Sequence, residues 1–371
     1  MRTPTLRLGP LPPLQVSPGT LVTVLLVAAL MYPVMSGPGI APATSALLAL
    51  TMGVFLILSV LAHEIAHAVV ARAFGARIDH IALTLWGGHT QCRTDRMSSL
   101  GSLLVSLSGP ATNGVLAALT AAAGALVDPE SAIGLLLGSM TWMNLVLAVF
   151  NLLPGLPMDG GRALESLLGI VLRSPTTGTV VTAWIGRAIA VGVVLYPLWL
   201  IVRRGGAGTG SLLMLVWAML IAGMLWQGAS QALRGATVQR RVETLDAAAL
   251  ARGLRLVPSQ TPLAHLGTPE QAAQVLLLDQ AGARPGTVGR AFRIDPSAAA
   301  SVPPEHCATT PASAVAAPLG DVGSLSVHLR GDDLISHMVE HPAALYLVVE
   351  EAGGLRGVIM SADVNALLRG R

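Results

Sequence analysis

The sequence predicts a polytopic α-helical membrane protein with about six transmembrane helices, followed by a C-terminal α/β tail. Hydrophobic residues make up 53% of the 371 residues and charged residues only 12%, whereas a soluble domain contains roughly 25% charged residues. Six apolar runs approach or exceed the roughly 20 residues that a membrane helix needs. Acidic residues concentrate after these runs, because 13 of the 20 lie from Glu243 onward. We therefore expect a membrane part and a more polar tail.

The apolar runs set the expected domain boundaries. They cover about Thr20–Met35, Ala43–Phe74, Leu100–Val127, Ala132–Leu153, Val180–Val202 and Ser211–Leu233. We expect an N-terminal segment at 1–19, a six-helix domain at 20–235 and a tail at 236–371. Arg2 and Arg7 precede the first run, so the positive-inside rule predicts a cytoplasmic N-terminus. Six crossings of the cell membrane then return the tail to the cytoplasm.

Charge and cysteine content exclude two further classes of protein. The net charge is +3 and the arginines are scattered at the ends of segments rather than clustered. We therefore expect no nucleic-acid partner. The two cysteines lie far apart in the sequence and predict no disulfide framework.

The second apolar run ends in His63-Glu64-Ile65-Ala66-His67, an H-E-x-x-H motif. On a helix, residues four apart leave the same face, so the two imidazoles can bind one Zn²⁺. Glu64 then lies beside the metal, where it can take a proton from water. The motif also occurs by chance, but ionisable residues inside a membrane helix are costly and indicate function. We therefore predict a zinc site on this helix.

A third zinc ligand is expected where the fourth apolar run breaks. The stretch from Asn151 to Arg162 reads N-L-L-P-G-L-P-M-D-G-G-R, and its prolines end the helix. An ordinary turn would also account for Pro, Asp and Gly here. By the crossing count, however, Asp159 lies on the same side of the membrane as His63 and His67. We therefore predict that Asp159 completes the site.

Between the second and third runs, Ile81, Leu83 and Leu85 alternate with smaller residues, which predicts a β-strand. Gly87 and Gly88 follow and either end the strand or let another backbone approach closely. Non-helical backbone at membrane depth is tolerated only against protein or a water-filled cavity. We expect this strand, with Leu85, Gly87 and Gly88, to bind a locally unwound substrate by β-augmentation.

These residues resemble the site-2 protease family of intramembrane zinc metalloproteases over about residues 20–235. HEIAH on a membrane helix and, two crossings later, Asn151-x-x-Pro-x-x-x-x-Asp159-Gly both match. The resemblance implies one zinc per chain held by His63, His67 and Asp159, with Glu64 as general base and then acid. It also implies that Asn151 hydrogen-bonds the oxyanion. The implied substrates are transmembrane segments of membrane proteins, such as anti-sigma factors or signal-peptide remnants.

The tail resembles a pair of cystathionine-β-synthase (CBS) domains, at about 246–300 and 308–371. Each half reads helix, strand, strand, helix. Asp363 stands where such domains place a ribose-binding carboxylate, although Met360 replaces the usual Ser or Thr. The resemblance implies binding of an adenine nucleotide, regulation of the membrane domain, or a homodimer formed through the tail.

Two other functions remain compatible with the sequence. One is a channel or transporter gated by the CBS pair, with the histidines and Asp159 lining an ion path. This alternative leaves Glu64, beside two histidines at ligand spacing, without a role. The other is a catalytically inactive relative of the proteases that binds membrane proteins without cutting them. Metal analysis separates the first alternative from the protease, and a Glu64→Gln variant separates the second.

Overall fold

A computed structural model describes residues 5–6, 12–37, 39–84, 87–93, 97–204, 206, 208–272, 274–280, 287–351 and 353–370. Arg2, Arg7 and Leu85, which enter the predictions above, lie outside these residues. The chain divides into two compact units, Met1–Ala236 and Thr237–Arg371. Each unit contains its own β-sheet.

Among the described residues, six helices are long and apolar enough to cross a membrane, five of them within the first unit and the sixth starting in it and ending beyond Ala236. These helices are α1 (Pro18–Met35), α2 (Pro42–Ala73), α3 (Ser99–Gly124), α4 (Ala132–Asn151), α6 (Pro175–Arg203) and α7 (Thr209–Glu243). Large apolar side chains such as Leu21, Trp142 and Leu220 point outward from them, as expected for surfaces that face lipid. The prediction of a six-helix membrane protein is confirmed.

Prolines and serine caps explain where several of these helices begin. The Ser98 hydroxyl accepts a hydrogen bond from the Gly101 N–H at 3.1 Å, and Ser131 caps α4 through the Gly134 N–H at 3.0 Å. Proline occupies the first turn of α1, α2 and α6, where its missing N–H costs nothing. Helix α7 continues ten residues beyond the apolar run, which ends at Leu233, because Arg and Gln are also good helix formers.

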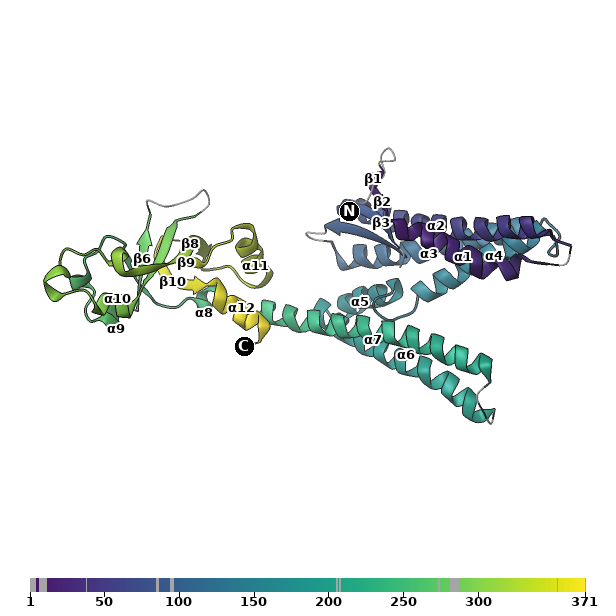
Figure 1. Ribbon diagram of the computed structural model, residues 1–371. Helices are drawn as coiled ribbons and strands as arrows, with labels where there is room; N and C mark the ends of the chain where they lie inside the picture. Colours follow the sequence, from purple (N-terminus) through teal and green to yellow (C-terminus); the bar gives the residue numbers. More distant parts are fainter. Residues whose placement is uncertain are drawn as a thin grey trace. The chain divides into compact units, whose positions relative to one another are not determined.

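A four-stranded sheet lies at one end of the group formed by α1 to α4 (Figure 1). Its order is β1 (Thr5–Leu6), β2 (Leu14–Val16), β3 (Arg77–Thr84) and β4 (Gly87–Arg93). Strands β3 and β4 form an antiparallel hairpin, whereas β2 pairs with β3 in parallel. The predicted strand is therefore present as β3, and the two glycines begin the next strand instead of ending this one.

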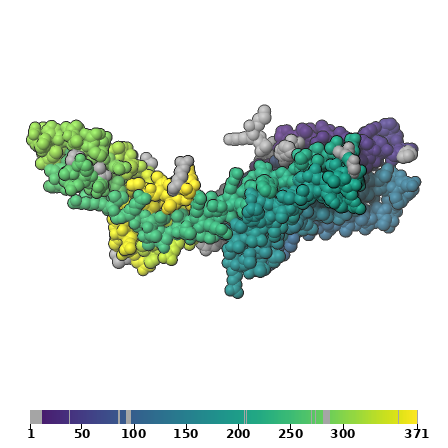
Figure 2. All heavy atoms as spheres, turned by 90° about the horizontal axis from the view of Figure 1, so that it is seen from below, coloured from purple at the N-terminus to yellow at the C-terminus, as the bar shows by residue number. Residues whose placement is uncertain are grey.

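Side-chain contacts of one arginine, which lies between two tryptophans, link helices α6 and α7. The Arg187 guanidinium is 4.9 Å from the ring centroid of Trp184 on α6 and 4.7 Å from that of Trp226 on α7. It also donates to the Ser230 hydroxyl on α7 at 3.1 Å. Cation–π contacts of this kind are stronger when water is excluded. In the space-filling view the teal atoms of α6 and α7 lie next to one another on the face shown (Figure 2).

The second unit is a six-stranded sheet with helices, in the order β10-β9-β8-β7-β6-β5. Its strands are β5 (Arg255–Pro258), β6 (Val275–Asp279), β7 (Gly289–Ile294), β8 (Ala316–Ser326), β9 (Leu345–Val349) and β10 (Leu355–Met360). Its helices are α8 (Ala247–Leu250), α9 (Pro269–Ala272), α10 (Pro296–Ala300), α11 (Gly331–Glu340) and α12 (Ser361–Arg369). The mixed α/β tail is confirmed.

The strand pairing of this unit repeats. In the first half β5 runs parallel to β6, and β6 runs antiparallel to β7. In the second half β8 runs parallel to β9, and β9 runs antiparallel to β10. Each half therefore has the order strand, helix, strand, strand, helix. Each half also has buried apolar residues around Leu277 and around Val348, respectively.

Candidate metal centre and active site

Helix α2 presents the two histidines of the HEIAH motif to one point. The Nε2 atoms of His63 and His67 are 3.0 Å apart, and the two rings stand nearly perpendicular at a centroid distance of 4.6 Å. His63 and Glu64 are buried, with 8% and 7% of their surface exposed. The helix can place them so because residues four apart in the sequence lie one turn apart on the same face.

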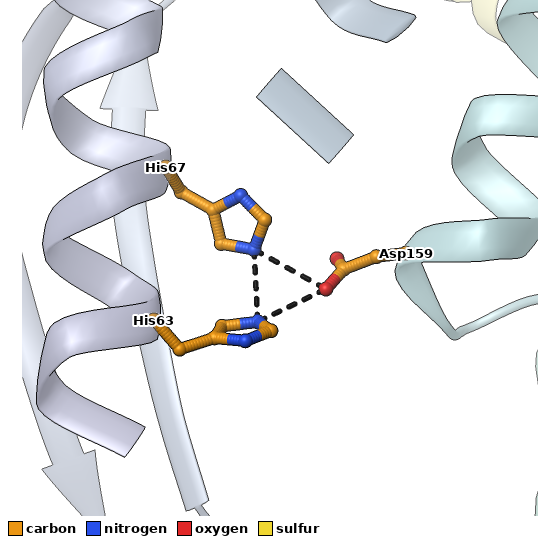
Figure 3. Close-up of side chains that lie close together, drawn as sticks. All are labelled: His63, His67 and Asp159. Atoms are coloured by element: carbon orange, nitrogen blue, oxygen red, sulfur yellow. Dashed lines mark hydrogen bonds and ion pairs between the residues drawn. The ribbon is translucent and has the colours of Figure 1, made fainter. Parts of the chain in front are cut away.

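Asp159 comes from a different element and meets both imidazoles (Figure 3). It is the first residue of α5 (Asp159–Val171), a short helix between α4 and α6 that the apolar runs did not predict. Its Oδ2 atom lies 3.0 Å from His63 Nε2 and 3.2 Å from His67 Nε2. The predicted three ligands therefore lie together, and they are a group able to hold a metal ion among the described residues.

Glycines position the turn that delivers Asp159. A Cβ on Gly160 or Gly161 would collide with the backbone of the preceding loop, at Leu152 and Gly155 respectively. The first turn of α5 can therefore pack directly on the end of α4. On its other side, the Gly155 Cα lies 3.3 Å from the position of a Cβ on Gly186 of α6. Any larger residue at these glycines would push the carboxylate away from the histidines.

The Nδ1 atom of each imidazole, which faces away from Asp159, has a hydrogen-bond acceptor. His67 Nδ1 donates to the Val105 backbone carbonyl at 2.7 Å, and His63 Nδ1 donates to Asn113 Oδ1 at 2.6 Å. A backbone carbonyl can only accept, so the hydrogen of His67 lies on Nδ1. Metal-binding histidines characteristically donate their second N–H to such a partner. Both Nε2 lone pairs are then directed at Asp159.

The donor set and its spacing fit Zn²⁺. Two imidazole nitrogens and one carboxylate oxygen, with a fourth position left for water or substrate, are typical of catalytic zinc sites. Tetrahedral zinc with bonds of about 2.0–2.1 Å needs ligand atoms about 3.3 Å apart, close to the distances found here. The Asp159 carboxylate supplies the negatively charged oxygen ligand of this set.

Glu64 lies beside this group without belonging to it. The Thr90 hydroxyl donates to Glu64 Oε2 at 2.7 Å and lies 3.2 Å from the Glu64 carbonyl oxygen. A Cβ on Gly88 would lie 2.6 Å from Glu64 Cγ, so β4 can approach the carboxylate only because residue 88 is glycine. The orientation of Glu64 is therefore set by β4.

A cavity of about 280 Å³ opens onto these residues. Its lining includes His63, Glu64, His67, Gly88, His89, Thr90, Asn151, Asp159 and Arg162. Asn151, the residue expected to contact the oxyanion, therefore shares a cavity with the metal ligands. His89 also lines this cavity but lies outside the three-residue metal group.

Sequence reasoning missed four features of the site, namely Thr90, Val105, Gly109 and Asn113. Helix α3 passes Gly109 directly against the imidazoles, since a Cβ there would lie 2.5 Å from Nε2 of both histidines. Asn113 is 1% exposed within a membrane helix, and a buried amide in such a helix is the signal that could have identified it.

Of the other predicted residues, Leu85 lies outside the described residues and Asp363 belongs to the second unit. The Asp363 carboxylate is 3.4 Å from a guanidinium nitrogen of Arg252, and both side chains are partly exposed. The structure thus places Asp363 in an ion pair at the start of α12.

Comparison with known proteins connects this geometry to a family. The family model for peptidase family M50 matches residues 51–133 and 127–195, which include the HEIAH motif and Asp159. Over these residues the membrane region is similar to peptidase family M50. The match agrees with the resemblance drawn from the two motifs, and zinc is the cofactor consistent with this match and with the His63, His67 and Asp159 group.

Curated relatives agree with this match. Rip3 of Mycobacterium tuberculosis, provisionally described as a zinc metalloprotease, is 29% identical over 345 residues, which cover 85% of this chain and 79% of Rip3. The similarly described sll0528 of Synechocystis is 29% identical over 212 residues, covering 57% of this chain and 54% of sll0528. Zinc metalloprotease MJ0392 of Methanocaldococcus jannaschii is 31% identical over 148 residues, or 39% and 42% of the two chains. The chain thus spans about half the length of sll0528.

Among solved structures, the site-2 protease from Methanocaldococcus jannaschii matches 62% of this chain and 95% of its own, at 23% identity. The TM-score is 0.41, a value at which the two overall folds are not shown to coincide.

Proposed function

We propose that this chain is an intramembrane zinc metalloprotease that hydrolyses peptide bonds in the transmembrane segments of other membrane proteins. One observation carries the proposal. The HEIAH histidines of a membrane-spanning helix and Asp159, which comes from a separate helix, direct three ligand atoms to one point at 3.0–3.2 Å. A general base, Glu64, is adjacent in the same cavity.

The residues that line the cavity have separate roles in the proposed hydrolysis. Zinc supplies a Lewis acid that polarises the scissile carbonyl and acidifies water. Glu64 takes the proton from the attacking water and passes it to the leaving amine. Asn151 donates a hydrogen bond to the oxygen that becomes negative during the attack, the kind of contact that stabilises an oxyanion. Arg162, one turn after Asp159 on α5, adds a positive charge at the cavity edge.

The edge of β4 is the proposed binding site for the substrate. A transmembrane helix hides its peptide bonds in its own hydrogen bonds and must unwind before cleavage. In this sheet β2 already occupies one edge of β3, which leaves β4 as the edge next to the cavity. Because Gly88 lies against Glu64, an extended segment added to β4 passes beside the general base.

A Gly87→Pro variant tests this binding mode. Gly87 has φ +122°, a backbone angle that proline, fixed near −65°, does not adopt. We expect loss of cleavage with zinc content unchanged, measured on the same detergent preparation, because residue 87 touches no ligand. Retained cleavage would contradict binding along β4.

The proposed substrates are single-span regulatory proteins, such as anti-sigma factors, and signal-peptide remnants. The proposed orientation has the N-terminal segment and the tail in the cytoplasm. Support for the orientation comes from the arginines in the last turns of α2 and α7, namely Arg72, Arg240 and Arg241, in line with the positive-inside rule.

The tail is proposed to be a pair of CBS domains that regulates or dimerises the protease. The repeated strand pairing of its two halves supports a tandem module. Asp363 is the proposed ribose contact for an adenine nucleotide, which would have to displace Arg252 from it. Light scattering of the purified chain tests dimer formation, and calorimetric titration with ATP tests nucleotide binding.

The decisive experiment measures zinc per protomer and cleavage of a single-span membrane protein by wild type and by Asp159→Ala. We expect about one zinc per wild-type chain and cleavage, with zinc and cleavage both lost in Asp159→Ala. Removing one of three protein ligands leaves a site too weak to hold the metal. A metal-free wild type that conducts ions would instead favour the channel or transporter, and a zinc-loaded wild type that cuts nothing would favour the inactive relative.

A further inference from the structure

A chain of buried polar side chains leads away from His63 across three membrane helices. Asn113 on α3 accepts from His63 Nδ1 at 2.6 Å, and its amide nitrogen donates to Asn144 Oδ1 on α4 at 3.0 Å. The Asn144 amide nitrogen in turn lies 3.2 Å from the Ser59 hydroxyl on α2. Asn113, Asn144 and Ser59 are 1%, 0% and 1% exposed. Figure 1 shows the three helices side by side.

Such a chain is costly in a membrane unless every polar group is satisfied. An amide without hydrogen-bond partners is strongly destabilising in an apolar environment. Here each amide oxygen and nitrogen of the two asparagines has a partner. Asn144 has no direct contact with a metal ligand, but it is connected to the ligand His63 through its hydrogen bond with Asn113.

A backbone carbonyl fixes the orientation of the two asparagine amides in this series of hydrogen bonds. The Met140 carbonyl lies 3.2 Å from the Asn144 amide and can only accept, so the Asn144 nitrogen must face it. Asn144 Oδ1 then faces Asn113 and requires a donor, which is the Asn113 nitrogen. Asn113 Oδ1 is left to face His63 and can only accept.

His63 must therefore carry its hydrogen on Nδ1, which leaves the Nε2 lone pair for the metal. His67 also carries its hydrogen on Nδ1, but its acceptor is the Val105 backbone carbonyl. A backbone carbonyl cannot rotate, whereas the side-chain amide of Asn113 can exchange its oxygen and nitrogen. If Asn113 turned over, its N–H would face His63 Nδ1 and favour the tautomer with the hydrogen on Nε2.

We infer that Asn144 is a positioning residue for the zinc site: it holds the Asn113 amide in the orientation that keeps His63 Nε2 free to bind zinc. This inference rests on the proposed function, since the role of Asn144 has meaning only if zinc binds. It assigns to α4, which supplies no ligand, control over the zinc affinity of α2.

The test is a double-mutant cycle on the full chain in detergent, with the zinc dissociation constant measured by competition with a chelator. Asn144→Leu removes the anchor at similar volume and should weaken zinc binding about 10–100-fold, the usual effect of losing support for a ligand. Asn113→Asp presents an acceptor to His63 in either orientation, so in this background the orientation of residue 113 no longer depends on Asn144. In the Asn113→Asp background, Asn144→Leu should then change the dissociation constant by less than about threefold.

A purely structural role for Asn144 predicts a different result, namely the same loss of affinity in both backgrounds. That result, or an Asn144→Leu variant with wild-type affinity, would overturn the inference. Wild type without zinc would instead overturn the proposed function, so the two failures are distinguishable.

If Asn144→Leu does not fold, the wild type itself provides the test. In zinc-loaded protein labelled with ¹⁵N-histidine, the ring nitrogens of His63, assigned by their absence in His63→Gln, report which nitrogen carries the hydrogen. The expected result is a neutral ring protonated on Nδ1. Protonation of the neutral ring on Nε2 would show that the amide chain does not set the tautomer.

Discussion

Gly109→Ala is expected to abolish both zinc binding and cleavage, although it changes none of the ligands. The added methyl group would lie 2.5 Å from Nε2 of both His63 and His67, well inside van der Waals contact and in the space where the lone pairs converge. Helix α3 would have to move away from α2 to admit it, and that movement would also displace the Asn113 and Val105 acceptors. Zinc per protomer, measured by elemental analysis, checks the first effect, and a cleavage assay checks the second.

Gly114→Ala is the matched control because it lies in the same helix and its added methyl group would meet no atom within 4 Å. It should keep zinc and activity. Alanine also favours helix over glycine by about 1 kcal/mol, so this variant should be at least as stable as wild type. A zinc-loaded, active Gly109→Ala protein would show that α3 does not pack against the imidazoles as described here.

Glu64→Gln is expected to keep zinc and to lower the rate of cleavage by about 10²–10⁴-fold, the usual contribution of a general acid–base. Gln has nearly the same shape as Glu but cannot take a proton from water. Zinc should remain because His63, His67 and Asp159 form the metal group without Glu64. Parallel measurements of zinc content and of the single-turnover rate test the two effects independently.

Thr90 provides a graded control for Glu64. Thr90→Val removes the hydroxyl that donates to Glu64 Oε2, and loss of a hydrogen bond to a charged group costs about 1.5–3 kcal/mol. Cleavage should therefore fall by roughly tenfold or more, whereas Thr90→Ser should retain most of it. Full activity in Glu64→Gln would rule out Glu64 as the base, and loss of zinc in that variant would make it a fourth ligand.

The long helices could be predicted because a membrane crossing requires a continuous apolar run. The ends of the second run, at Ala43 and Phe74, fall one residue from the ends of α2. Helix α5 was missed because it is amphipathic and short, with Arg162 and Glu165 among its 13 residues, and so it has no apolar run. Strand β2 was missed because three residues are too few for an alternating pattern.

The ligands could be predicted because their chemistry depends on local spacing. His63 and His67 lie one turn apart on any helix, and Asp159 follows from a helix break on the correct side of the membrane. The surrounding contacts could not be predicted in this way. Gly109 and Asn113 act through the packing of α3 on α2, and Thr90 acts through the register of β4, which no spacing within the sequence defines.

The parallel pairing of β2 with β3 has a consequence for how the protein is made. Leu14–Val16 leave the ribosome first, but their partners Ile81 to Leu83 follow only after α1 and α2 have both been synthesised. The two strands can meet only if α1 and α2 insert as a hairpin that returns the chain to the side from which it started. A failed insertion of either helix would leave β2 and β3 on opposite sides of the bilayer. Assembly of the sheet that orients Glu64 is therefore possible only after the first two helices have inserted correctly, which keeps a misinserted chain from forming an active protease.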